Sequence, residues 1–122
     1  MKIHESAENY LEAILVIGKR KGYVRSIDIA NELSVTKPSV SVAMKSFKNE
    51  GYILVSESGD ISLTDKGKEV AERVYERHNV IANFLLLMGV SEENAYADSC
   101  KIEHVISDES FERLKDFISK NK

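Results

Sequence analysis

Residues 26–51 read SIDIANELSVTKPSVSVAMKSFKNEG, and this stretch sets the architecture of the first half of the chain. Apolar residues at helical spacing predict a short helix over 26–33, with Ser26 as its cap, and a longer helix over 36–50. Thr36 is expected to cap the longer helix, which ends at a glycine. Two helices joined by so short a connection are typical of a helix-turn-helix.

The flanking residues extend this pair of helices on both sides. Residues 6–21 carry apolar side chains on one helical face, which predicts a helix before the pair. Residues 52–55 and 61–63 are strand-like, and the turn signal at 58–60 lies between them. The order of three helices followed by a hairpin predicts a winged helix-turn-helix.

The remaining residues predict an all-helical second part. Helices are expected over 64–88, over 92–106 and from 107 onward. The apolar seam of the long helix is Ala71, Val74, His78, Ile81, Leu85 and Met88. The apolar side of the last helix is Phe111, Leu114, Phe117 and Ile118. The sequence therefore predicts a mostly α fold with a small β-hairpin, divided into a winged helix-turn-helix domain (1–63) and a helical domain (64–122) suited to dimerisation.

Composition narrows the class of protein. The chain has 122 residues, one cysteine and a net charge of −3, so an intrachain disulfide framework is excluded and one or two small domains are expected. The N-terminus carries no long apolar run, and the longest apolar stretch, 84–88, is far too short to cross a bilayer. We expect a cytoplasmic protein that does not associate with membranes.

The charge is unevenly distributed along the chain. Residues 13–48 hold seven basic and two acidic side chains, whereas residues 64–122 hold nine basic and twelve acidic ones. A basic segment that coincides with a helix-turn-helix indicates binding to double-stranded DNA, although an ordinary solvated surface is the alternative. The candidate DNA-contacting residues are Arg25, Thr36, Lys37, Pro38, Ser39, Ser41, Lys45, Lys48, Ser58 and Gly59.

A second group of residues has the chemistry of metal ligands. Cys100, Glu103 and His104 stand at positions i, i+3 and i+4, so on a helix they share one face. The remaining ligands are sought among Asn9, Glu12 and His78. Each of these residues has an ordinary alternative, such as a buried apolar cysteine or a solvated carboxylate.

Together these residues resemble the metal-dependent repressor family that includes the diphtheria toxin repressor and the manganese transport regulator. The resemblance runs from Glu8-Asn9-Tyr10-Leu11-Glu12 through the helix-turn-helix and wing to Arg77-His78, and is most specific at Cys100-Lys101-Ile102-Glu103-His104-Val105-Ile106-Ser107-Asp108. It implies a homodimer that binds a divalent metal between its DNA-binding and dimerisation parts and represses metal-uptake genes. It also implies the short form of the family, without the C-terminal SH3-like domain.

The resemblance mixes the two branches of the family. The iron branch has its cysteine, glutamate and histidine ligands at Cys100, Glu103 and His104, and a methionine where this chain has Asn9. The manganese branch has an aspartate at that last position, a glutamate at the position of Cys100, and ligands corresponding to Glu12 and His78. In the ancillary site of the iron branch only His78 matches, since Ala82 and Tyr96 replace a glutamate and a histidine.

The sequence therefore predicts a metal-dependent transcriptional regulator that is not an enzyme and has no small-molecule substrate. A thiolate ligand favours Fe(II), with Mn(II), Co(II), Ni(II) or Zn(II) as the other candidate ions. The partners are expected to be a DNA operator and a second copy of the chain. The alternatives are a winged-helix regulator that does not depend on metal, a small metalloenzyme and a dimerisation adaptor.

Overall fold

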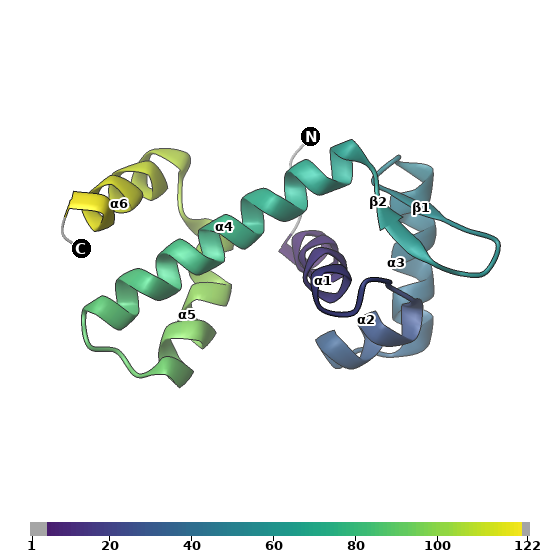
Figure 1. Ribbon diagram of the computed structural model, residues 1–122, viewed down its shortest axis with the longest axis horizontal. Helices are drawn as coiled ribbons and strands as arrows, with labels where there is room; N and C mark the ends of the chain where they lie inside the picture. The colour runs from purple at the N-terminus through teal and green to yellow at the C-terminus, as the bar shows by residue number, and fades with distance from the viewer. Residues whose placement is uncertain (1–4, 121–122) are drawn as a thin grey trace. The chain divides into compact units, whose positions relative to one another are not determined.

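The computed structural model describes residues 5–120 as six helices and a two-stranded antiparallel sheet, which confirms the predicted fold class (Figure 1). The elements are α1 (Glu5–Lys21), α2 (Ser26–Leu33), α3 (Lys37–Asn49), β1 (Ile53–Val55), β2 (Ile61–Leu63), α4 (Asp65–Leu87), α5 (Glu92–Val105) and α6 (Asp108–Lys120). The chain forms two compact units, Met1–Glu72 and Arg73–Lys122, so α4 begins in the first unit and continues into the second. Among the described residues, no helix is long and apolar enough to span a membrane.

The caps of the helix-turn-helix agree with the sequence at α3 and differ from it at α2. Thr36 caps α3, because its hydroxyl oxygen accepts a hydrogen bond from the amide of Ser39 at 3.3 Å. The expectation that Ser26 caps α2 is wrong: Ser26 is the first helical residue, and the cap is Arg25. The reason is Asp28, whose carboxylate accepts a hydrogen bond from the amide of Arg25 at 3.0 Å and so satisfies the start of the helix.

The wing is a short hairpin beside α3 (Figure 1). Ile53 pairs with Leu63 and Val55 with Ile61. Tyr52, which was expected in the first strand, precedes it, because its amide donates to the carbonyl of Phe47 at 2.9 Å at the end of α3. The wing is therefore joined directly to the last turn of α3.

Each unit has its own apolar core. In the first unit the predicted apolar faces of α1 and α3 are buried, and the ring of Tyr10 lies edge-on to that of Phe47. Their fully or largely buried members are Leu11, Ile14, Ile17, Val40, Met44 and Phe47. In the second unit Val74 and Ile81 of α4 are buried, together with Phe111 and Ile118 of α6. Met88 and Phe117, which lie on the apolar sides predicted for the long helix and the last helix, are 63% and 57% exposed in the single chain. Packing of the seam on a second subunit stays a prediction.

Gly67, in the first turn of α4, is packed against the wing. A Cβ atom at this position would lie 2.1 Å from the carbonyl oxygen of Tyr52, which is a backbone clash. We predict that Gly67→Ala lowers the free energy of unfolding by about 1–3 kcal/mol, as overpacking does. Gly18→Ala is the matched control, because Gly18 lies within α1 and a Cβ atom there would be 3.6 Å from Val24, an ordinary contact distance. Alanine also stabilises a helix relative to glycine by up to about 1 kcal/mol. Urea unfolding measures both, and equal effects of the two substitutions would contradict the clash.

Asp28 gives the first unit a pH-dependent contribution to stability. The hydrogen bond from Lys21, at 2.6 Å, holds the pKa of the Asp28 carboxyl below its ordinary value. A lowered folded pKa means that the contribution is present above the unfolded carboxyl pKa, about 3.9, and is lost as the pH falls through the folded pKa. We expect Asp28→Asn to be less stable than the wild type at pH 7, with the difference shrinking below about pH 4. Urea unfolding across pH 2.5–7 measures this, and a constant difference would contradict it.

Candidate metal centre and nucleic-acid surface

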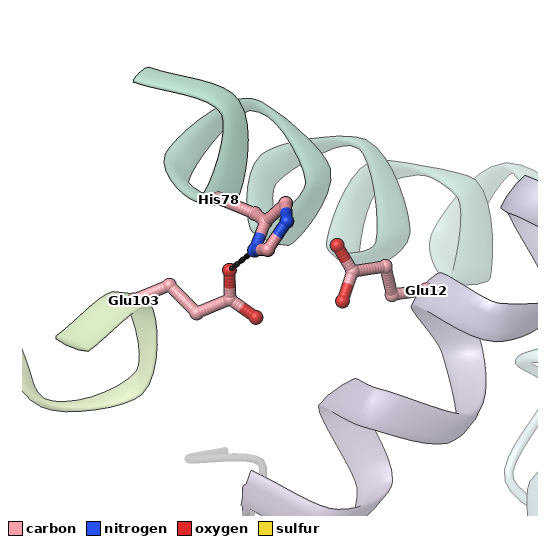
Figure 2. Close-up of side chains that lie close together, drawn as sticks. All are labelled: Glu12, His78 and Glu103. Atoms are coloured by element: carbon pink, nitrogen blue, oxygen red, sulfur yellow. Dashed lines mark ion pairs between the residues drawn. The ribbon is translucent and has the colours of Figure 1, made fainter. Parts of the chain in front are cut away.

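Four of the predicted metal ligands lie together within the C-terminal unit. His78 of α4 faces α5, where its Nδ1 atom lies 3.1 Å from Oε2 of Glu103 and 3.7 Å from Sγ of Cys100 (Figure 2 draws His78 and Glu103). On the other side of the carboxylate, Nε2 of His104 lies 3.2 Å from Oε1 of Glu103. Glu103 is therefore the centre of the group, with one imidazole at each oxygen.

The carboxylate of Glu103 has the environment of a metal ligand. Its side chain is 0% exposed, and both of its oxygens lack a hydrogen-bond partner among the described residues. The two imidazole nitrogens are close, but their contacts do not have hydrogen-bond geometry. A buried carboxylate without donors is costly unless a cation neutralises it. Glu103, two imidazoles and a thiol form a donor set that fits a divalent transition metal.

The sequence of α5 explains why Glu103 is buried. Ala95, Ser99 and Glu103 follow one another at intervals of four residues and are the buried positions of this helix. The first two are small, so α5 can approach α4 closely and carry the carboxylate to His78. Cys100 lies beside this buried face and is itself exposed.

Arg77, for which the sequence predicted no role, connects the helices around the site. Its guanidinium is buried, donates hydrogen bonds to the carbonyls of Glu103 (3.4 Å) and Ile106 (2.9 Å), and forms an ion pair with Asp108. It also lies over the ring of Phe111, 5.2 Å from its centroid. Arg77 thus joins α4 to the end of α5 and the start of α6, and it directly precedes His78 in the sequence.

Two further neighbours of His78 were also missed. The hydroxyl of Ser99 lies 3.0 Å from Nδ1, and the ring of Tyr96 is stacked on the imidazole with a centroid separation of 6.2 Å. The signal available in the sequence was the spacing, because Ser99 precedes Glu103 by four residues and so lies on its helical face.

The other two predicted ligands belong to the N-terminal unit. Asn9 and Glu12 stand three positions apart on α1, so they share one helical face as expected (Glu12 is also drawn in Figure 2). Their part in a metal site stays a prediction.

The predicted DNA-contacting residues lie on α3, the preceding turn and the wing. All of them are exposed except Gly59, which is half-buried and has a positive φ of 91° in the wing turn. The hydroxyls of Thr36 and Ser39 also bond to each other at 2.8 Å, so both belong to the cap of α3. Arg25 donates from Nε to Asp60 of the wing turn at 3.1 Å, which connects the start of α2 to the wing.

Six of the seven basic side chains of residues 13–48 fall into two groups. Arg20, Lys21 and Arg25 form ion pairs with Glu32, Asp28 and Asp60. Among the described residues, no ion pair holds Lys37, Lys45 or Lys48, all of which are exposed on α3. The unneutralised positive charge is therefore concentrated on the helix predicted to bind DNA.

Comparison with known proteins finds a DNA-binding domain and a metal-binding domain in the two parts of the chain. Residues 2–60 match the family model of the iron dependent repressor N-terminal DNA binding domain, and residues 64–122 match that of the iron dependent repressor metal binding and dimerisation domain. The HTH-type transcriptional regulator MntR of Geobacillus kaustophilus is 37% identical over 113 residues, which are 93% of this chain and 80% of that protein.

Solved structures show the same fold over nearly the whole chain. A structure of IdeR from T. acidophilum matches with a TM-score of 0.82 at 26% identity, and a structure of the manganese regulator SloR with a TM-score of 0.81 at 28% identity. Each match covers 98% of this chain and 55% of the other, so this chain spans little more than half the length of those regulators. The chain belongs to the iron-dependent repressor family of metal-dependent transcriptional regulators.

Proposed function

We propose that this protein is a cytoplasmic repressor that binds a DNA operator as a homodimer when it is loaded with a divalent metal, and that it controls genes for metal uptake. The observation that carries the proposal is the buried Glu103 carboxylate, which has two imidazoles beside it and no hydrogen-bond donor among the described residues. A cation supplies the neutralising charge that the protein itself lacks there.

The DNA-binding part of the proposal depends on α3. Lys37, Lys45 and Lys48 are exposed and are suited to phosphate contacts, while Ser39 and Ser41 present small hydroxyls that can approach base edges. The wing turn, with Ser58 and Gly59 at its tip, would contact the adjacent groove or backbone. A homodimer places two such helices at a fixed half-site spacing.

Metal control follows if both units contribute ligands. In this proposal His78, Cys100, Glu103 and His104 hold the metal from the C-terminal unit, and Glu12 and Asn9 contribute from α1. The support is the donor chemistry at Glu103 and the match of these positions to ligands of the family. Bound metal would restrict the orientation of the two units, so that less conformational entropy is lost when the dimer binds its operator.

The choice of metal depends on Cys100. A thiolate favours Fe(II), Co(II), Ni(II) and Zn(II) over Mn(II), whereas carboxylate and imidazole ligands also accept Mn(II). We propose Fe(II) as the physiological ion and Mn(II) as the alternative, which the name of the relative SloR supports. A regulator that no longer depends on metal would bind its operator equally well with and without these ions.

Operator binding across a metal series tests the function. A duplex selected by the protein from a random DNA pool is titrated at fixed salt, because phosphate contacts make affinity salt-dependent. We expect Fe(II) to tighten binding at least about tenfold, a coupling within the usual allosteric range. In Cys100→Ser this response to Fe(II) should fall and that to Mn(II) should change less, whereas Lys101→Ala, one exposed residue further along α5, should keep the Fe(II) preference. Affinity that is independent of metal in the wild type would overturn the proposal.

Glu103→Gln tests the metal site without DNA. Because the substitution removes a buried charge that has no donor, we expect the metal-free variant to be as stable as the wild type or more stable by about 1 kcal/mol. The wild type should gain about 2.7 kcal/mol at a metal concentration of a hundred times Kd, and the variant should gain almost nothing.

Glu93→Gln is the control for this experiment, because Glu93 is exposed in the first turn of the same helix. Chemical unfolding with and without metal measures all three proteins. A marked loss of metal-free stability in Glu103→Gln would mean that protonated imidazoles already neutralise the carboxylate, and would contradict the argument.

A further inference from the structure

Ser99 is a fully buried polar side chain with no part in the ligand set. It is 0% exposed, on the face of α5 that packs against α4. Its hydroxyl donates a hydrogen bond to the carbonyl of Tyr96 at 3.0 Å and lies 3.0 Å from Nδ1 of His78. A serine hydroxyl has one hydrogen, so once that hydrogen points to Tyr96 the oxygen acts toward His78 as an acceptor.

Two other atoms also lie near Nδ1 of His78: a carboxylate oxygen, which accepts, and a thiol sulfur, which can accept or donate weakly. Oε2 of Glu103 lies 3.1 Å away and Sγ of Cys100 3.7 Å away. The contact with Ser99 has hydrogen-bond geometry, whereas the contact with Glu103 does not. An imidazole nitrogen whose nearest neighbours are two oxygen acceptors favours carrying the hydrogen, so we infer that the neutral ring has its proton on Nδ1 and its lone pair on Nε2.

The same turn of α5 also places an aromatic ring nearly parallel to the imidazole. The ring of Tyr96 is stacked on the imidazole with an interplanar angle of 24°, and its carbonyl holds the hydroxyl of Ser99. Tyr96 therefore orients the hydroxyl of Ser99 through its carbonyl, and that hydroxyl contacts Nδ1 of His78. This is the arrangement by which residues behind a metal ligand set its tautomer and orientation.

We propose that Ser99 is a positioning residue of the metal centre, which accepts a hydrogen bond from Nδ1–H of His78 and so presents Nε2 to the metal. The inference deepens the proposed function and rests on it for the identity of the ligand. Ser99 acts only through His78 and makes no contact with the metal itself.

The tautomer can be read in the metal-free protein. Nitrogen-15 chemical shifts of His78, assigned by comparison with His78→Gln, distinguish Nδ1–H from Nε2–H at a pH where the ring is neutral. We expect Nδ1–H in the wild type, a shift of the population toward Nε2–H in Ser99→Ala, and the wild-type spectrum in Ser99→Thr, which keeps the hydroxyl. Ser119→Ala, exposed on α6, controls for loss of a serine elsewhere in the unit. An Nε2–H ring in the wild type, or an unchanged spectrum in Ser99→Ala, would overturn the proposal.

Titration with Mn(II) provides the second readout. Binding is measured as the decrease in the electron paramagnetic resonance signal of free Mn(II). We expect Ser99→Ala to weaken Mn(II) binding by about 10–100-fold and Ser99→Thr to restore most of it. Equal Mn(II) affinity in the wild type and Ser99→Ala would overturn the positioning role. A wild type that binds no Mn(II), Fe(II) or Co(II) would overturn the proposed function instead, and the metal-free tautomer would still decide whether Ser99 holds His78 as inferred.

Discussion

The constraint on which the C-terminal unit depends is the burial of one carboxylate, that of Glu103, without a hydrogen-bond donor. A buried anion raises the free energy of the folded state unless charge is supplied from outside the protein. Nδ1 of His78 and Nε2 of His104 lie beside its two oxygens, at nitrogen–oxygen separations of 3.1 and 3.2 Å. A bound cation would neutralise this carboxylate, so under the proposed function the stability of the unit would depend on the concentration of metal.

The packing of the helices around Glu103 keeps its carboxylate buried. Small residues at Ala95 and Ser99 allow α5 to lie close to α4, and Arg77 holds the end of α5 through the carbonyls of Glu103 and Ile106. Burial of the guanidinium is compensated by Asp108 and by the ring of Phe111. Since these contacts do not involve the carboxylate oxygens, they leave both oxygens available for the proposed cation.

The sequence predicted the helices from their helical spacing and the hairpin from its strand and turn residues, and the same helical spacing brought three candidate ligands onto one face. Cys100, Glu103 and His104 share a face by arithmetic alone, and the cap of α3 at Thr36 followed from its residue type. Spacing does not show which polar side chains become buried. The lack of a hydrogen-bond partner at Glu103 among the described residues and the contacts of Arg77 and Ser99 could therefore not be predicted. A periodic seam also does not say which of its members the same chain covers, and Met88 and Phe117 are exposed in the single chain.

The central claim is that Glu103 and His78 together bind a divalent cation. Anomalous X-ray diffraction from crystals of the Mn(II)-loaded protein, recorded on both sides of the manganese absorption edge, tests it most directly. The account predicts an anomalous peak about 2.0–2.3 Å from a Glu103 oxygen and from an imidazole nitrogen of His78. Manganese found only at exposed carboxylates, with Glu103 hydrogen-bonded to protonated imidazoles, would contradict it.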